Sequence, residues 1–430
     1  MAEGDRVDVV IVGAGLAGLA CAWTLLGHGV EVLVLERGDQ AGAKNLSGGR
    51  LYHGPLESLE LLDGAPYERV VTRESIALVA GGAVTQVSFA SDRLAEPERR
   101  SSTVLRARLD AWLADRVSGA GGVVATGTLV DGLVRDDGGT VRGVVAQGEE
   151  ILARVVVAAD GALSAMARHG GLRSELEPSQ LALGIKALYS LDAGKIEDRF
   201  CLAPGEGAAE LVVGEITSGL PGGAFLYTNR DSLSLGVVVR LDALASDAAA
   251  SPPDLLHAIE QRPEIARRIA GAELVEYGAH LVPEAAPDRF GRRVADGLVV
   301  VGDAAGLVIN HGITVRGMDL ALVSGVLAGQ AIAQALEQDD ASRAALSRYD
   351  DLLRDSTVGQ DIGRFAGSAE TLSRSWLTRD LPAIAADMAA ELYSFGPGPK
   401  ERLSTTAWRH LRRRVLHLGM LGELLRLRRL

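Results

Sequence analysis

The sequence predicts an α/β protein that combines a doubly wound parallel sheet with a second, β-rich region and a helical C-terminal part. Three observations indicate this fold. A β-branched run at residues 7–12 is followed by a glycine turn and an apolar helix, two further buried strands end in similar glycine turns, and residues 341–430 show mainly helical patterns. Unbroken β-branched runs are typical of parallel strands that are buried on both faces.

The first of these glycine turns has the spacing GxGxxG, with glycines at Gly13, Gly15 and Gly18. The first permits a tight turn, the second lets a pyrophosphate approach the backbone, and the third lets helix and strand pack closely. A phosphate would then lie on the helix N-terminus, where unpaired N–H groups favour an anion. Glu36 ends the next strand, where a carboxylate accepts hydrogen bonds from a ribose diol. We therefore interpret the segment as a dinucleotide site, with a purely structural turn as the alternative.

Composition excludes several other classes of protein. A chain of 430 residues is long enough for two or three domains, and a net charge of −12 with 4% aromatic residues argues against nucleic-acid binding. Cys21 and Cys201 are too few for the four thiolates of an iron–sulfur cluster, and they imply no disulfide framework. No leader peptide and no uninterrupted apolar segment of about 20 residues is evident, so we expect a cytoplasmic protein, soluble or peripheral to a membrane. We also expect no metal site.

The loop over residues 37–54 alternates polar side chains, among them Lys44, Asn45 and Arg50, with several glycines. Glycine allows a backbone to approach a flat or anionic ligand closely. A flexible surface connection is the alternative, and we prefer the ligand-binding interpretation.

Residues 75–90 predict a hairpin, and residues 104–120 predict a helix with Arg106 just inside its start. From the residues alone, Arg106 is either a solvated helix residue or a ligand contact. Residues 122–157 alternate apolar and polar positions, which predicts a small antiparallel meander that feeds a buried strand.

Two later strands end in glycine and aspartate. The strand at 155–159 runs into Asp160-Gly161, followed by a helix start at Ser164, and the strand at 298–301 runs into Gly302-Asp303. Asp303 could simply cap a turn. Three such junctions in one chain favour a single extended cofactor over three unrelated turns.

The middle of the chain, residues 172–284, lacks any comparable fingerprint and predicts a mostly β substrate-side domain. The elements expected there are strands at 181–191, 209–216, 224–228 and 233–240 and a helix near 253–270. A continuous helical pattern begins at Met318.

The end of the chain is basic. Residues 401–430 contain eight arginines, no lysine and two glutamates, a local charge of +6. Either this segment packs on its own domain with solvated arginines, or it docks to an acidic partner or to anionic lipid.

Seven segments of the chain together resemble one family. They are GAGLAGLACAWTLLGHGVEVLVLERG, KNLSGGRLY, LRARLDAWL, VVAADGALSAMAR, GGAFLYTNRDSLSLGVVV, YGAHLVPE and GLVVVGDAAGLVINHGITVRGMDLALVSG. The chain resembles the FAD-dependent electron transfer flavoprotein–quinone oxidoreductase family, in particular its shorter FixC-like branch, over most of its length. The stretch NHGITVRGMDLA is the most specific part, because broader FAD families share the glycine motif and the Asp-Gly and Gly-Asp pairs.

The resemblance implies FAD as the cofactor and a Rossmann-type, glutathione-reductase-like domain built from separate segments. We expect the FAD-binding domain over 1–60, 101–171 and 285–340, the β-rich substrate or quinone-side domain over 61–100 and 172–284, and the helical C-terminal region with its basic tail over 341–430. The residues implied to bind FAD are Gly13, Gly15, Ala17, Gly18, Glu36, Arg37, Lys44, Asn45, Gly48, Gly49, Arg106, Val130, Asp160, Gly161, Gly302, Asp303, Gly312, Thr314 and Gly317.

By position in the family, the glycine motif (Gly13, Gly15 and Gly18) would hold the pyrophosphate. Glu36 would bind the adenosine ribose, and Arg106 would contact the phosphate region. The backbone near Val130 would meet the adenine, and Asp303 the ribityl chain. Asp160 and Gly161 would shape the pocket. The residues implied to lie along the isoalloxazine are Lys44, Asn45, Gly48 and Gly49.

At the other end of the ring, Gly312, Thr314 and Gly317 would place N–H groups near the flavin pyrimidine, where they could stabilise negative charge on reduced flavin. The flavin itself performs the chemistry in such proteins, so we nominate no catalytic side chain.

The implied function is electron relay, from an electron transfer flavoprotein to a quinone or a ferredoxin-like partner. Long family members carry a cysteine-rich cluster domain that this sequence lacks, whereas FixC-like proteins resemble one subunit of an assembly with a two-subunit electron transfer flavoprotein and a small ferredoxin-like protein. The basic tail could serve that docking, or reach quinone at the inner face of the cell membrane.

Two other functions remain open. The first is direct turnover of a small organic substrate by an FAD-dependent reductase, dehydrogenase or monooxygenase, as in the related geranylgeranyl reductases and aromatic hydroxylases. The second is a flavin-holding assembly subunit without electron transfer, against which the complete glycine, Glu36 and Asp303 set argues.

Overall fold

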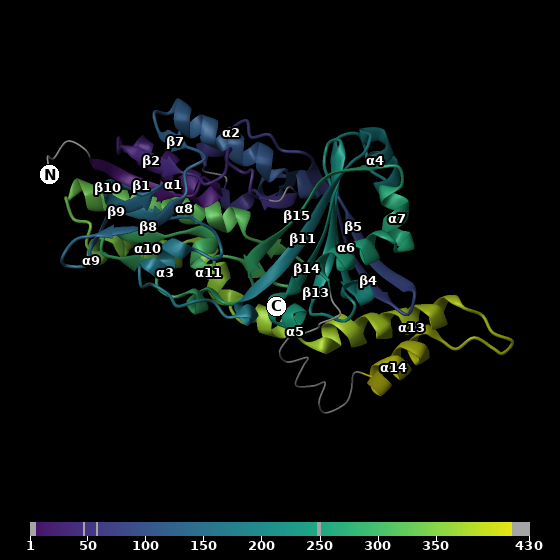
Figure 1. Cartoon of the computed structure of the whole chain (residues 1–430). Coiled ribbons are helices and arrows are strands. Elements are labelled where there is room, and N and C mark those ends of the chain that lie inside the picture. The colour runs from purple at the N-terminus through teal and green to yellow at the C-terminus, as the bar shows by residue number, and fades with distance from the viewer. Residues whose placement is uncertain (1–5, 46–47, 57–58, 247–250, 415–430) are drawn as a thin grey trace.

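The computed structural model describes residues 6–45, 48–56, 59–246 and 251–414. Two sheets organise this part of the chain, and Figure 1 shows the parallel sheet with its helices at one side of the molecule and the second sheet beside it. The predicted fold class is confirmed: a parallel α/β sheet, a second β-rich part and a helical C-terminal region.

The first sheet has eight strands, of which five run parallel. In spatial order these are β17 (Leu298–Val300), β10 (Glu149–Ala158), β1 (Arg6–Val12), β2 (Val32–Leu35) and β7 (Val123–Ala125). Three antiparallel strands complete the sheet: β16 (Val294–Ala295), β8 (Val130–Arg135) and β9 (Val141–Ala146). The meander predicted over 122–157 is therefore correct for β8, β9 and β10, but β7 pairs in parallel with β2 instead.

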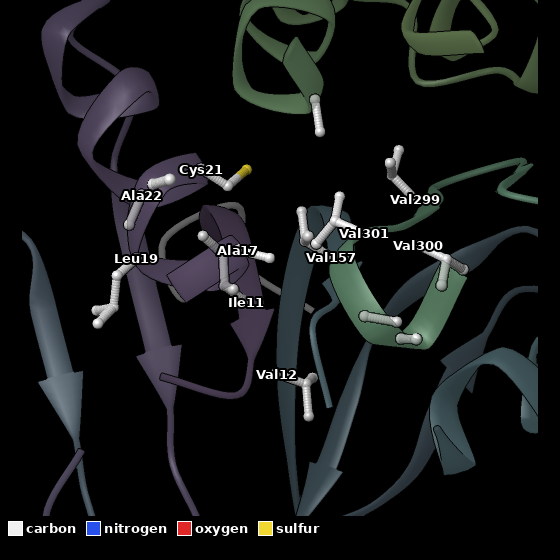
Figure 2. Close-up of a cluster of buried hydrophobic side chains, with 14 of the residues drawn as sticks. Ile11, Val12, Ala17, Leu19, Cys21, Ala22, Val157, Val299, Val300 and Val301 are labelled. Carbon is white, nitrogen blue, oxygen red and sulfur yellow. The ribbon is translucent and has the colours of Figure 1, made fainter. Parts of the chain in front are cut away.

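A dense core joins this sheet to α1 (Leu16–Gly27), α2 (Arg106–Gly119) and α8 (Met318–Glu337). Figure 2 shows side chains of β1, α1 and β17 gathered there, including the fully buried Ile11, Leu19 and Cys21. Helices α1 and α8 cross in close contact because Gly325 has no side chain. A Cβ at Gly325 would lie 2.2 Å from the carbonyl oxygen of Ala17.

Helix α8 is the one described helix that is long and apolar enough to cross a membrane, and 72% of its most apolar window is buried inside the structure. The sequence analysis expected no such segment. The burial of α8 follows from its packing against α1, so its apolar character has an explanation within the core.

The second sheet has nine strands. In spatial order they are β15 (Glu273–Pro283), β11 (Leu181–Ser190), β14 (Ser232–Arg240), β13 (Gly222–Thr228), β12 (Glu206–Gly214), β4 (Val70–Ala80), β6 (Ser101–Val104) and β3 (Gly49–Tyr52), with β5 (Ala83–Ala90) paired to β4. The hairpin predicted over 75–90 is confirmed as β4–β5. Strand β15 was not among the predicted elements.

Four helices lie in the chain between strands of the second sheet. They are α4 (Ala193–Phe200), α5 (Leu241–Ser246), α6 (Pro252–Glu260) and α7 (Pro263–Ile269). The single helix expected near 253–270 is wrong, since α6 and α7 are separate. Pro263 explains the break, because proline lacks an N–H donor and disfavours helical geometry at the residue before it.

Strands β3 and β6 pair with each other antiparallel and lie at the end of the second sheet. The expected domain limits at 60/61 and 100/101 place both strands with the first sheet. Hydrogen bonding thus runs across those limits, and the division of the chain into domains stays a prediction.

The C-terminal region is helical as expected. It comprises α9 (Arg343–Leu346), α10 (Arg348–Asp355), α11 (Thr357–Arg364), α12 (Ser368–Leu372), α13 (Leu381–Tyr393) and α14 (Leu403–Arg414). Helix α10 packs on α8, while α13 lies along β4 and β5 (Figure 1). Arg409 of α14 forms ion pairs with Glu391 and Glu401, so part of the basic segment packs on its own domain. The rest of the basic tail, beyond Arg414, lies outside the described residues.

Candidate functional site at the carboxyl ends of the parallel strands

The glycine turn after β1 divides into packing positions and an open position. Gly13 has a φ of +107°, and a Cβ there would lie 2.4 Å from the carbonyl oxygen of Ala159 at the end of β10. A Cβ at Gly18 would lie 2.1 Å from the carbonyl oxygen of Gly13. At Gly15, in contrast, a Cβ would meet only the Arg106 guanidinium, at 3.8 Å. The middle glycine therefore faces open space beside a cation.

That open space lies at the N-terminus of α1. Gly15 is the N-cap of this helix, and in the described part of the chain no side chain makes a capping hydrogen bond there. The first turn of α1 also carries no acidic residue. Unpaired backbone N–H groups and an adjacent guanidinium suit a phosphate, so these residues fit the pyrophosphate of a dinucleotide.

Arg106 is held by a carboxylate that the sequence analysis did not identify. Arg106 donates from Nε to Oδ1 of Asp110 at 2.8 Å and from a terminal nitrogen to Oδ2 at 2.7 Å. The Asp110 side chain is 0% exposed, and its Oδ2 also accepts from Asn45 Nδ2 at 2.7 Å. Asp110 therefore orients two of the predicted cofactor contacts at once. Its position four residues after Arg106 on the same helix face was the available signal.

Glu36 lies at the end of β2 and orders the loops around it. Its carboxylate accepts from the N–H of Ala14 at 2.9 Å and from the N–H of Gly38 at 2.7 Å. The N–H of Thr128 donates to the Glu36 carbonyl at 2.8 Å, just before β8 starts at Val130. The structure thus brings Glu36 and the Val130 region together, as expected for residues at one end of a cofactor.

The predicted isoalloxazine loop is fixed by two glycines. A Cβ at Gly48, which has a φ of +86°, would lie 2.2 Å from Ser234 Oγ of β14. A Cβ at Gly49 would lie 2.9 Å from the Cε of Met318, the first residue of α8. The glycine pair is therefore clamped between the second sheet and the N-terminus of α8. Arg37 and Lys44 are exposed, and Ser47 lies outside the described residues.

The turn after β17, at Gly302 and Asp303, packs directly against the first turn of α1. A Cβ at Gly302 would lie 2.8 Å from the Cβ of Ala17, and the Gly302 N–H donates to Ser324 Oγ at 3.0 Å. Burial raises the pKa of Asp303, while the charges of Arg106 and Lys186 oppose that rise. Asp303 therefore lies within electrostatic reach of cations from α2 and from the second sheet.

Lys186 was missed by the sequence analysis. It lies on β11, and its Nζ donates to the carbonyl oxygen of Gly48 at 3.2 Å. Burial, with a smaller contribution from the charge of Arg106, lowers the pKa of Lys186 to about 8, while Glu276 and Asp303 act in the opposite direction. A lysine inside the otherwise apolar run LALGIKALYS was the signal that could have identified it.

A short hairpin, β18 (Ile309–Asn310) and β19 (Val315–Arg316), leads into α8. The Gly312 N–H donates to Asn310 Oδ1 at 3.1 Å, and the Thr314 hydroxyl hydrogen-bonds the ring of His311. Gly317 is the N-cap of α8, without a side-chain cap among the described residues. The predicted pyrimidine contacts thus surround the start of α8, whose first turn also carries the buried Asp319, paired with Arg316.

Asp160 has a structural role at the second junction. Its carboxylate accepts from the Ser164 hydroxyl at 2.6 Å and from the Met166 N–H at 3.1 Å, at the start of α3 (Ala165–His169). Burial raises the pKa of Asp160, and these hydrogen bonds oppose the rise. Because the Asp160 Cα would lie 3.4 Å from a Cβ at Gly13, Asp160 and Gly161 are placed to shape the cleft wall. Their contact with a cofactor stays a prediction, as do the other assigned contacts.

Glu284 lines a small pocket beside the β18–β19 hairpin, with Asn310, Phe365 and Ser368. Asn310 Nδ2 approaches its carboxylate at 3.4 Å, and burial raises the pKa of Glu284 to about 7. The folded state therefore holds this proton more tightly than the unfolded state, so its stabilising effect is complete below pH 4.5 and is lost as pH rises through 7.

We expect Glu284→Gln, which stays neutral, to gain about 2 kcal/mol of stability relative to the wild type between pH 5 and pH 8. Urea unfolding of the FAD-loaded protein at both pH values measures this difference. Glu337→Gln, at an exposed position of α8, is the matched control and should show no such gain. An equal effect of Glu284→Gln at both pH values would show that the carboxyl does not titrate in this range.

Residues from the three junctions, all at the carboxyl ends of parallel strands β1, β10 and β17, lie close together at one site. This is where open α/β sheets bind their ligands. The sequence profile described as "FAD binding domain" matches residues 6–188, which include the glycine turn, Arg106 and Asp160. Fold and profile define an FAD-binding protein.

Relatives identify the family. The chain is 40% identical to Protein FixC of Escherichia coli strain K12 over 408 residues, which cover 94% of this chain and 95% of that protein. It is 39% identical to the probable electron transfer flavoprotein-quinone oxidoreductase YdiS of the same organism, over 92% of each chain. The chain therefore belongs to the FixC-like electron transfer flavoprotein–quinone oxidoreductase family, as the motifs predicted.

Solved structures agree with the fold. A geranylgeranyl bacteriochlorophyll reductase-like protein from Thermoplasma acidophilum matches with a TM-score of 0.73 at 19% identity, covering 98% of this chain and 99% of that one. PqsL, a probable FAD-dependent monooxygenase from Pseudomonas aeruginosa, matches with a TM-score of 0.61 at 20% identity, covering 87% and 98%. At these identities the likeness establishes the fold alone.

Proposed function

We propose that this protein relays electrons from an electron transfer flavoprotein, through bound FAD, to a quinone or a ferredoxin-like partner. The observation that carries the proposal is similarity, over 92% and 98% of the chain, to two relatives named probable electron transfer flavoprotein-quinone oxidoreductases. The site supports it, since its described residues suit binding and orienting a flavin, the group that would perform the chemistry.

Bound FAD would supply the capacity to accept and release electrons. The N-terminus of α1 and Arg106 would bind the pyrophosphate, and Glu36 the adenosine ribose. Gly48 and Gly49 would let the flavin ring approach the backbone. The N-terminus of α8 at Gly317 would present N–H groups to the pyrimidine side, where developing negative charge is stabilised.

Exposed apolar side chains on the β18–β19 hairpin and in the C-terminal helical region support contact with a partner. Ile313 and Val315 of the β18–β19 hairpin are 58% and 49% exposed. Tyr393, Phe395 and Trp408 are exposed in the C-terminal helical region. We propose a cytoplasmic protein that docks with an electron transfer flavoprotein and a ferredoxin-like subunit and reaches quinone at the inner membrane face through its C-terminal region.

Anaerobic mixing tests the proposal. We expect reduced electron transfer flavoprotein to bleach the oxidised-flavin absorbance of this protein rapidly, and NADPH to leave that absorbance unchanged. Adding a soluble quinone should then restore the absorbance.

Bleaching by NADPH, or only in the presence of an organic substrate, would contradict the relay and favour a direct oxidoreductase. Purified protein that carries FAD but exchanges electrons with no partner would point instead to an assembly subunit.

A further inference from the structure

Lys186 lies at the candidate site, but the family resemblance assigns it no role in FAD binding. It comes from β11 in the second sheet, whereas its contacts belong to the cofactor side. Its Nζ donates to Gly48 at 3.2 Å, and its charge acts on Asp303, which follows β17 of the first sheet. The Lys186 ammonium therefore lies between the Gly48 loop and the end of β17, beside the expected position of the flavin ring.

The surroundings of Lys186 leave its charge poorly solvated. Its side chain is half-buried, and the Phe225 ring lies 5.6 Å from Nζ. Arg106 adds a second positive charge that opposes the ammonium, while Glu276 and Asp303 favour it. Burial lowers the pKa of neighbouring His280 to about 4, with Lys186 as the next largest cause, so this histidine is neutral at pH 7.

A charge that is costly to bury is typical of a functional position. A nearby anion would offset the cost of desolvating the ammonium. A reduced flavin carries negative charge on its pyrimidine side. Lys186 contacts the Gly48 carbonyl, and the next residue, Gly49, packs against Met318 at the start of α8. Lys186 and the α8 N-terminus thus approach the same region from opposite sheets.

We propose that Lys186 is a positioning residue whose positive charge stabilises the reduced form of the bound FAD and so raises its reduction potential. This inference rests on the FAD site but not on the identity of the electron donor. The alternative is that Lys186 only anchors the Gly48 carbonyl.

Three substitutions distinguish the effect of the Lys186 charge from the effect of its hydrogen bond to the Gly48 carbonyl. Lys186→Arg keeps the charge and a donor, Lys186→Gln keeps a donor without charge, and Lys186→Met keeps neither. Lys195→Met, at an exposed position of α4, is the matched control. The readout is the dissociation constant of the flavin N5–sulfite adduct of the holoprotein, in which sulfite adds to the oxidised flavin and leaves it negatively charged.

We expect Lys186→Gln and Lys186→Met to weaken sulfite binding at least tenfold, and Lys186→Arg and Lys195→Met to stay within about threefold of the wild type. A tenfold change corresponds to about 30 mV in a two-electron potential, which a dye-coupled redox titration measures independently.

Wild-type sulfite affinity in Lys186→Gln would overturn the proposal and leave only the anchoring role. If Lys186→Met does not retain FAD, Lys186→Gln still decides, because its neutral amide keeps a hydrogen-bond donor at this position. Sulfite binding needs no electron donor, so a relay that fails with electron transfer flavoprotein would leave this result intact.

Discussion

Asp110→Ala is expected to lower the free energy of unfolding by about 3–5 kcal/mol and to weaken FAD binding about a hundredfold. The Asp110 carboxylate is fully buried and holds Arg106 through two hydrogen bonds and Asn45 through a third. Its removal leaves the partly buried Arg106 guanidinium without its counter-charge. Arg106 and Asn45 both lose the hydrogen bonds that orient them. Urea unfolding and fluorescence titration of the apoprotein with FAD measure the two effects.

Asp115→Ala provides the matched control, because Asp115 lies on the same helix but is exposed. It should change stability by less than about 0.5 kcal/mol and leave the FAD dissociation constant unchanged. If Asp110→Ala kept wild-type affinity for FAD, Arg106 would not be a cofactor contact, and the assignment of the pyrophosphate site would be wrong.

Gly18→Ala and Gly15→Ala are expected to fail in different ways. A methyl group at Gly18 would lie 2.1 Å from the Gly13 carbonyl oxygen, so α1 must move away from β1, at a cost of about 3 kcal/mol. A methyl group at Gly15 meets only Arg106, at 3.8 Å, and should cost under about 1 kcal/mol as an N-cap change. The Gly15 methyl would instead occupy the expected phosphate position.

Thermal unfolding of the apoproteins and FAD titration distinguish the two variants. Gly18→Ala should unfold at a clearly lower temperature, whereas Gly15→Ala should be nearly as stable as the wild type but bind FAD at least tenfold more weakly. Equal loss of stability in both variants would mean that the turn is only structural, which is the alternative that the sequence left open.

Much of the first sheet and of its junctions could be predicted because the controlling interactions are local in sequence. The β1 run, the glycine spacing and the helix at Met318 each carry their own signal, and the structure contains each of them. Strand β15 was not predicted; it lies at one edge of the sheet, its residues are mostly exposed or half-buried, and only Pro283 is buried. The sheet membership of β3 and β6 also depends on pairing between distant segments.

The missed site residues share one cause. Lys186 and Gly48 are 138 positions apart, and no pattern within β11 shows which loop the lysine meets. Asp110 was closer to prediction, because its spacing from Arg106 suits an ion pair on one helix face. Its burial and its third partner, Asn45, become visible only when the loop after β2 folds over α2.

The measurement that tests the central claim most directly is a crystal structure of the protein with FAD bound. We predict the pyrophosphate at the N-terminus of α1 beside Arg106, the adenosine ribose on Glu36, and the flavin ring along Gly48–Gly49. The Lys186 ammonium should lie beside the ring. Density for FAD elsewhere, or a flavin ring turned away from both Gly48 and the α8 N-terminus, would contradict the account.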